Sequence, residues 1–312
     1  MKRFFILASA AIVALASCAK TEVVYKDAPQ EIAFKQITDV MTKADQLGDG
    51  AYTAMNVYAF TDDHTQYFTE GWVSFASQGE GTDWVATPAK YWPLSGGLHF
   101  LYYAPTDVPA TAAYSTEDAY TLKVAGLDRT KDFLYGAEVK SESKTNVAMP
   151  VVLRHALTKV KVSVTSDLAD LVVKNVAFKT VAVSGTLTVE YAETDDQETK
   201  NDERLVWSAV TPEDVELLAN KTMVADVTQS EECYILPCTQ TALVLTYNLP
   251  GAAEQTYTHT FANTDKWLDG HYYTYDITIT ANEIKFVPSE TAWEAVTALE
   301  TVIDPNMATN LQ

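Results

Sequence analysis

The chain has 312 residues, of which 47% are hydrophobic, and its formal net charge is −20. The length indicates two domains rather than one, and the hydrophobic content is sufficient for a large core. The acidity excludes nucleic acid as a favoured partner, because phosphate binding needs a basic patch. Seventeen tyrosines and six tryptophans favour strands over helices.

Residues 1–17 are typical of a bacterial signal peptide. An apolar run over residues 4–16 follows two basic residues and is too short to span a bilayer. The run ends in Leu15-Ala16-Ser17-Cys18, which resembles the lipobox of bacterial lipoproteins. The resemblance implies that Cys18 becomes the first mature residue and carries acyl chains. Each methylene group buried in the membrane contributes about 0.8 kcal/mol to binding, so more than one acyl chain gives a stable anchor. The alternative is an ordinary secretory signal with an unrelated cysteine.

Residues 18–30 are predicted to be a lipidated tether, and residues 31–37 the first strand. The following stretch, residues 38–46, is polar and places Lys43, a basic residue, directly before the small Ala44. This composition predicts an exposed loop that is open to a trypsin-like protease.

Short apolar runs bounded by turn signals recur through the rest of the chain and predict further strands. In the first half they are residues 55–60, 98–104, 121–124 and 133–137; from residue 151 on they are residues 160–164, 172–178, 181–191, 233–236, 241–249 and 256–261. Residues 214–218 are expected to form one or two helical turns. The spacing indicates an all-β sandwich in each half, with an N-terminal domain over residues 31–150 and a C-terminal domain over residues 151–312.

The strongest strand signal lies near the C-terminus. Residues 272–279 alternate apolar and polar side chains with a period of two, after a turn at Gly270. A second strand begins at Glu283 and is expected to end at Pro288, because proline is tolerated only at the edge or end of a strand. A terminal strand of this kind can complete its own sheet or pair with a neighbouring molecule.

No residues with catalytic or metal-binding spacing stand out. The five histidines are scattered, and the acidic loop over residues 195–203 lacks the glycine and spacing of a calcium-binding loop. Cys233 and Cys238 lie roughly 16 Å apart in an extended strand and point to opposite faces, so free thiols are expected. We therefore expect no enzyme, no cofactor and no metal.

Three tryptophans, Trp72, Trp84 and Trp92, fall within apolar runs of the first half. Core packing is the expected role, and stacking on a sugar ring is the alternative.

Several stretches together resemble the fimbrillin family, the type V pilins of Bacteroidetes. They occur in the family's order and cover nearly the whole chain: Leu15-Ala16-Ser17-Cys18, Trp84 followed by Tyr91-Trp92-Pro93, Phe100-Leu101-Tyr102-Tyr103-Ala104-Pro105, Phe133-Leu134-Tyr135-Gly136, Leu153-Arg154-His155-Ala156-Leu157-Thr158-Lys159-Val160, Tyr234-Ile235-Leu236-Pro237, and residues 267–279 with Asn282-Glu283-Ile284.

The resemblance implies two tandem transthyretin-like Greek-key β-sandwich domains and an assembly mechanism. The precursor travels to the cell outer membrane as a lipoprotein. A trypsin-like protease cuts the loop after the first strand, here between Lys43 and Ala44, and a strand carrying Ile32, Phe34 and Ile37 leaves. The family's best-known processing occurs at arginine, which this loop lacks.

The resemblance also implies that the C-terminal segment, residues 283–312, supplies a donor strand to another subunit. The donor side chains expected here are Ile284, Phe286, Trp293, Val296 and Leu299. The sequence thus predicts a structural subunit of cell-surface fimbriae that polymerises with other fimbrial subunits and supports adhesion. The alternative is a monomeric surface lipoprotein or a fimbrial tip adhesin that binds glycan or protein ligands.

Overall fold

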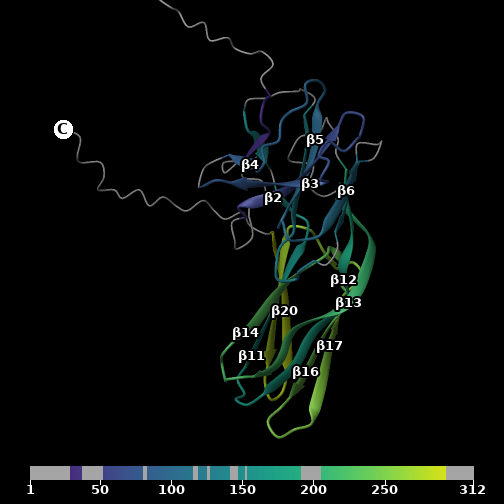
Figure 1. Ribbon diagram of the computed structural model, residues 1–312. Helices are drawn as coiled ribbons and strands as arrows, with labels where there is room; N and C mark the ends of the chain where they lie inside the picture. Colours follow the sequence, from purple (N-terminus) through teal and green to yellow (C-terminus); the bar gives the residue numbers. More distant parts are fainter. Residues whose placement is uncertain are drawn as a thin grey trace, which may run out of the picture.

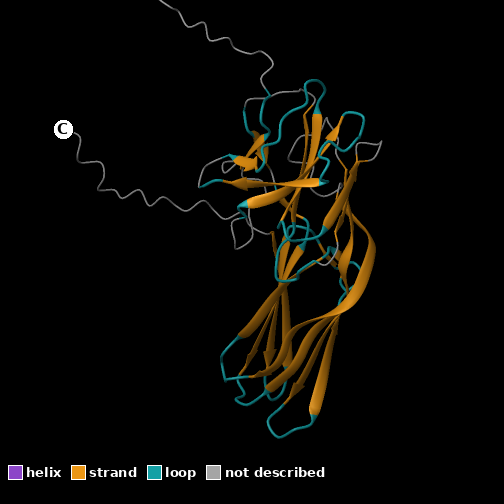
Figure 2. Ribbon diagram, viewed as in Figure 1, coloured by secondary structure: helices purple, strands orange, loops and turns teal. Residues whose placement is uncertain are grey.

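The computed structural model describes residues 29–36, 52–79, 83–114, 119–124, 127–140, 147–151, 153–190 and 205–292. Within these ranges every regular element is a strand, which confirms the predicted all-β class (Figure 2). The strands are β1 (Ala33–Gln36), β2 (Ala54–Thr61), β3 (Trp72–Ser77), β4 (Trp84–Ala86), β5 (Leu98–Ala104), β6 (Ala110–Tyr114), β7 (Ala119–Val124), β8 (Leu134–Lys140), β9 (Met149–Val151), β10 (Arg154–His155), β11 (Thr158–Ser166), β12 (Val172–Glu190), β13 (Leu205–Thr222), β14 (Gln229–Ile235), β15 (Cys238–Thr239), β16 (Ala242–Asn248), β17 (Glu254–Thr260), β18 (Lys266–Trp267), β19 (His271–Ile279) and β20 (Ile284–Ala292).

The molecule is elongated, with the earlier strands in the upper half of Figure 1 and most of the later strands below. The upper half contains a sheet in the order β10-β8-β5-β2-β3-β4-β1-β9. The lower half packs the sheet β14-β11-β19-β20 against the β17-β16-β12 side of a third sheet, which continues through β7 and β6. β15 and β18 form a separate short pair.

The long hairpin β12–β13 joins the two halves. β12 pairs with β16 through residues 172–179 and with β7 through residues 185–190, while β13 runs along its other edge. Four register shifts interrupt the β12–β13 pairing, and such shifts bend a strand pair and increase its twist. Two strand pairs, β7 with β12 and β10 with β8, connect residues before residue 150 with residues after it. Hydrogen bonding therefore links the two stretches of chain that the sequence assigns to separate domains.

One sequence prediction in this hairpin is wrong. Residues 214–218 do not form helical turns but lie in the extended strand β13, where Val215 and Leu218 face the core. The charged residues around them had favoured a local helix, but cross-strand pairing to the long β12 decides the conformation.

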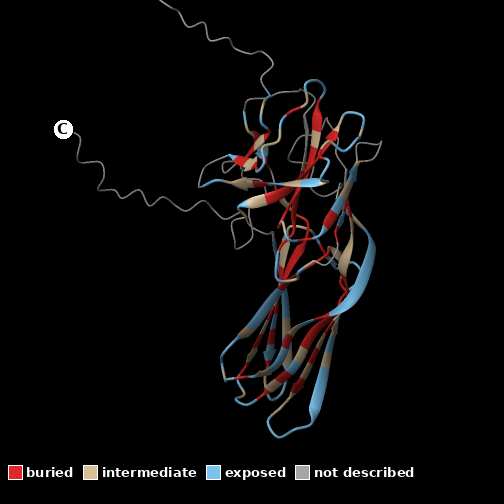
Figure 3. Ribbon diagram, viewed as in Figure 1, coloured by how far each residue is buried: buried red, intermediate tan, exposed pale blue. Residues whose placement is uncertain are grey.

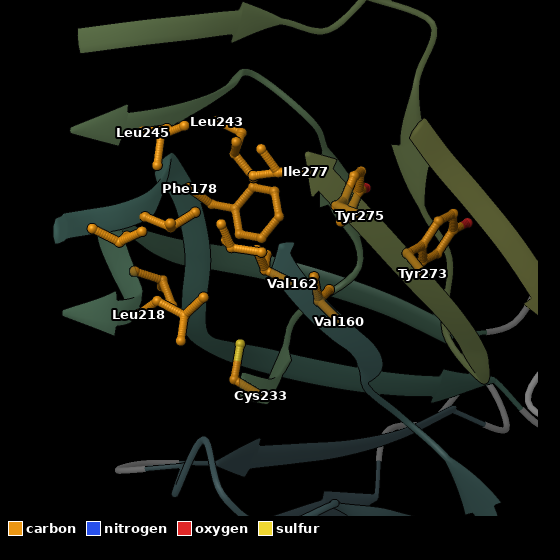
Figure 4. Close-up of a cluster of buried hydrophobic side chains, with 14 of the residues drawn as sticks. Val160, Val162, Phe178, Leu218, Cys233, Leu243, Leu245, Tyr273, Tyr275 and Ile277 are labelled. Atoms are coloured by element: carbon orange, nitrogen blue, oxygen red, sulfur yellow. The ribbon is translucent and has the colours of Figure 1, made fainter. Parts of the chain in front are cut away.

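Buried residues, red in Figure 3, occur along both halves of the molecule, and their side chains form three clusters. The lowest is centred on Phe178, whose ring lies among Val162, Leu243 and Ile277 in Figure 4. Phe178 also meets Trp267 edge to face with the ring centres 4.8 Å apart, a favourable aromatic geometry. Because β11, β12, β16 and β19 all contribute to this cluster, it holds the two sheets of the lower half together.

The predicted strand over residues 272–279 is confirmed as β19, with its alternate side chains buried at Tyr273, Tyr275 and Ile277. β20 is longer than predicted, because it continues through Pro288 opposite Tyr275. β20 is an edge strand, where a missing N–H is tolerated. Cys233 is buried, Cys238 is half-buried, and both are free thiols as predicted.

Candidate functional site

β1 is a four-residue strand inserted between two partners. It pairs with β4 in the antiparallel sense, with Ala33 opposite Val85, and with β9 in the parallel sense, with Gln36 opposite Val151. In Figure 1 this short strand lies beside β4 in the upper half. β1 therefore satisfies the backbone edges of two other strands at once.

β1 and the residue before it direct two side chains into the core. Ile32 and Phe34 are completely buried, whereas Ala33 is half-buried and Lys35 is exposed. The Phe34 ring meets Phe75 and Phe100 edge to face at centre distances of 4.9 and 5.3 Å. Ile32 and Phe34 thus belong to the buried cluster of the upper half, and Phe34 lies within a group of aromatic rings.

The chain just before β1 is also held by backbone bonds. The Ile32 amide donates to the Lys90 carbonyl at 2.7 Å, and the Trp92 amide donates to the Gln30 carbonyl at 2.9 Å. A single bridge pairs Glu31 with Tyr91. We call the site that holds residues 30–36 the β1 groove; its walls are β4, β9 and residues 90–92.

The predicted donor segment begins in β20. Ile284 and Phe286 are half-buried and pack against the lowest cluster, and Phe286 stacks on Tyr275 with the ring centres 5.7 Å apart. Within the described ranges β20 has β19 as its one neighbour in the sheet, so its other edge is open there. The first part of the predicted donor thus completes the chain's own sheet.

Seven predicted site residues lie outside the described ranges, namely Cys18, Ile37, Lys43, Ala44, Trp293, Val296 and Leu299.

The three tryptophans of the first half have different environments. Trp84 and Trp92 are buried, as core packing predicts, but the Trp72 side chain is 43% exposed and Tyr91 is 47% exposed. Trp72 and Tyr91 are therefore accessible to a ligand at the surface.

A buried polar pair, Asp132 and His155, was not predicted from the sequence. The Asp132 carboxylate contacts His155 Nδ1, and its second oxygen accepts the Phe133 amide at 2.8 Å. Both side chains are almost completely inaccessible. In the sequence each residue stands directly before apolar residues, in Asp132-Phe133-Leu134 and in His155-Ala156-Leu157. A titratable residue next to an apolar run that is expected in the core is the one sequence feature that could have indicated a buried polar pair.

Neither a metal site nor a membrane-spanning helix occurs in the ranges that the structure describes. Histidine, cysteine and carboxylate side chains form no group of three that could hold an ion there. The same ranges contain no helix with the length and hydrophobicity needed to cross a membrane.

Several solved structures are similar to this chain. A candidate cell adhesion protein from Bacteroides uniformis ATCC 8492 is 18% identical with a TM-score of 0.53, over 84% of this chain and 99% of that one. A second candidate cell adhesion protein, from Bacteroides ovatus ATCC 8483, is 12% identical with a TM-score of 0.50, over 85% and 98% of the two chains. At these identities the similarity establishes a shared fold.

A fimbrial protein from Bacteroides vulgatus ATCC 8482 also matches, at 15% identity and a TM-score of 0.45, over 85% of this chain and 99% of that one. No curated protein matches the chain. The family model described as fimbrillin-like matches residues 37–293. Because this match covers well over half of the sequence, the chain belongs to the fimbrillin-like family.

Proposed function

We propose that this protein is a structural subunit of cell-surface fimbriae that polymerises by strand exchange and supports adhesion. The observation that carries the proposal is the β1 groove. Residues 32–36, which comprise the completely buried Ile32 and the four-residue strand β1 with the completely buried Phe34, are followed within a few residues by the predicted cleavage loop with Lys43 and Ala44. Cleavage there would leave β1 attached only by non-covalent contacts.

Packing of residues 32–36 contributes enough stability that another strand would have to take their place after they leave. Complete burial of Ile32 and Phe34 contributes about 3–6 kcal/mol together, before the backbone bonds to β4 and β9 are counted. Loss of β1 would expose the apolar side chains that pack on Ile32 and Phe34 and two strand edges, which is the condition for adding a strand from another molecule. The donor is the C-terminal segment of a second subunit, over residues 283–312.

The proposal extends to export and location. Cys18 carries the lipid that anchors the precursor in the outer membrane, and a trypsin-like protease performs the cut. Family membership and the fimbrial and adhesion relatives support a position at the cell surface. The proposed architecture is two tandem transthyretin-like Greek-key domains, over residues 31–150 and 151–312.

Limited trypsin digestion of the chain from Ala19 tests the proposal. We expect loss of the N-terminal segment through Lys43 by intact mass and a ladder of multimers on an unboiled SDS gel. A Lys43→Gln variant should remain monomeric. The matched Lys35→Gln variant, altered at an exposed position of β1, should form the ladder like the parent. Clean cutting without any ladder would contradict polymerisation by this chain alone.

A second candidate function is that of a monomeric surface or tip adhesin. The exposure of Trp72 and Tyr91 favours it, because exposed aromatic rings stack on sugars and on protein side chains. A Trp72→Ala variant that polymerises normally but loses binding to glycan arrays would support adhesion through this surface. Unchanged binding would remove the candidate.

A further inference from the structure

β9 (Met149–Val151) is the last strand of the upper sheet, and its neighbour there is β1. In the sheet order of the described residues, β4 and β9 flank β1, and β9 has no second strand beside it. The parallel pairing places Phe34 opposite Met149 and Gln36 opposite Val151. All the strand pairing of β9 in the described ranges therefore depends on the presence of β1.

The opposite wall of the β1 groove is paired independently of β1. β4 pairs with β1 along one edge and with β3 along the other, where Phe75 stands opposite Ala86 and Ser77 stands opposite Trp84. Departure of β1 would leave β4 paired with β3, whereas β9 would lose its partner strand. The two walls of the groove therefore differ in how firmly they are fixed.

β9 is also a weak strand by length and composition. It has three residues, and the middle one, Pro150, stands opposite Lys35 and has no N–H to donate. Met149 and Val151 are almost completely buried in the same cluster as Phe34, whereas Pro150 is exposed. Two buried side chains and one paired edge thus hold β9, and segments with so few contacts open locally at low free energy.

The chain that follows β9 is attached more firmly. Arg154 and His155 form β10, which pairs with β8, and the Ala156 amide donates to the Phe133 carbonyl at 3.0 Å. The buried contact of His155 with Asp132 adds a further attachment. β9 therefore lies directly before a fixed point of the chain and can open without disturbing the β8–β10 pair.

We propose that β9 is a movable wall of the β1 groove and that β1 keeps this wall closed. When β1 is absent, β9 separates from the upper sheet while β4 stays paired with β3. The emptied groove then has one permanent edge, that of β4. The dependence of β9 on β1 is a property of the intact chain, and its part in assembly rests on the strand departure proposed above.

A movable wall gives strand addition an order. An incoming strand pairs first with β4, in the antiparallel sense, because that edge keeps its position after β1 leaves. β9 then closes on the new strand and buries Met149 and Val151 again. The second edge of the groove thus forms only when the groove is occupied.

Hydrogen exchange of the uncut chain from Ala19 tests this dependence. Ala33→Cys and Val85→Cys, at directly opposite positions of the β1–β4 pair, form a disulfide that locks β1 to β4. Cys233→Ala and Cys238→Ala remove the native thiols, and neither new cysteine lies in β9. Exchange is followed by mass spectrometry on peptides that cover β1, β9, β3 and β19, before and after reduction of the disulfide.

We expect the disulfide to slow amide exchange in both β1 and β9 by about tenfold or more, because one opening event exposes both strands. β3 and β19 should exchange at the same rates in the oxidised and reduced proteins. Slower exchange in β1 with unchanged exchange in β9 would overturn the proposal. An equal change in all the strands, or no change in any, would overturn it as well.

A second variant weakens β1 instead of locking it. Phe34→Ala removes the buried ring of β1 and should accelerate exchange in β9. Phe68→Ala, at another buried phenylalanine of the same cluster, is the matched control and should accelerate exchange in β9 less. Equal acceleration in the two variants would contradict a specific dependence of β9 on β1.

These measurements need no proteolytic cut, so they are separate from the test of polymerisation. A ladder of multimers after digestion, with β9 exchanging independently of β1, would leave the proposed function standing and overturn the movable wall. Coupled exchange of β1 and β9 without any ladder would uphold the movable wall and contradict polymerisation.

Discussion

At the scale of single residues, Phe34 is the side chain on which the β1 groove depends most. Phe34→Ala should lower the free energy of unfolding by about 3–5 kcal/mol, because a buried phenylalanine leaves a cavity lined by Phe75 and Phe100. Urea unfolding of the uncut protein measures this change. The neighbouring Lys35→Ala variant should be close to the parent, since Lys35 is exposed, and equal losses in the two variants would contradict the assignment.

The buried pair of Asp132 and His155 supports a second prediction at this scale. Asp132→Ala should cost about 3–5 kcal/mol of stability, because it leaves the partner His155 and the Phe133 amide without their buried acceptor. Asp107→Ala, which breaks the exposed ion pair with Lys131, is the matched control and should have far less effect on the urea midpoint. A similar loss in both proteins would show that burial of the pair is unimportant.

Many side-chain positions can be predicted from the sequence, and the exception has a physical reason. Alternation predicts the inward positions of β19, and the thiols of Cys233 and Cys238 are free as expected. The partner of His155 could not be predicted, because Asp132 reaches it only through the pairing of β8 with β10.

At the scale of elements, the packing of β20 on His259 predicts a pH effect. Burial of the imidazole holds the pKa of His259 below its ordinary value of 6.5, with Asp265 acting in the opposite direction. The unfolded chain then binds a proton more readily than the folded chain, so stability is full above pH 6.5 and falls as the pH drops toward the folded pKa.

Urea midpoints measured above and below pH 6.5 check this effect, and a His259→Gln variant should show a smaller decrease than the parent. Carboxylates with lowered pKa values, such as Asp63 and Asp128, titrate in a more acidic window and do not interfere. An identical decrease in the variant would exclude His259 as its source.

The β12–β13 hairpin contains a close approach at Gly185. A Cβ atom there would lie 3.0 Å from the Ser208 carbonyl oxygen and 3.1 Å from a Val210 methyl group. Gly185→Ala should therefore destabilise the protein by about 1–3 kcal/mol through overpacking, measured by urea unfolding. Ser184→Ala, at the neighbouring position, is the control. If Gly185→Ala leaves the free energy of unfolding unchanged, β12 and β13 can move apart there at little cost.

The strand β13 could not be predicted from local sequence patterns. Most strands follow from apolar runs, but β13 is largely exposed and its apolar side chains follow no regular alternation, so its 18 residues give no strong strand signal. Its extended conformation comes from pairing with β12, and that pairing joins residues up to 50 positions apart, as between Val172 and Thr222.

At the scale of the whole molecule, the chain is a fimbrillin-like, all-β protein whose halves share a long hairpin. The sequence predicted the class and the family, and local patterns located most strands. Local patterns could not predict that β7 pairs with β12 and β8 with β10 across residue 150, because such long-range pairing depends on the complete fold. In the proposed assembly, β1 leaves its groove before subunits join.

The most direct test locks β1 in its groove. Ala33→Cys and Val85→Cys, placed at directly opposite positions, form a disulfide in the chain from Ala19 with the native thiols removed. After digestion at Lys43, the oxidised protein should stay monomeric on an unboiled SDS gel, and added reductant should release β1 and produce the ladder. A ladder in the oxidised protein, or none after reduction, would contradict the claim.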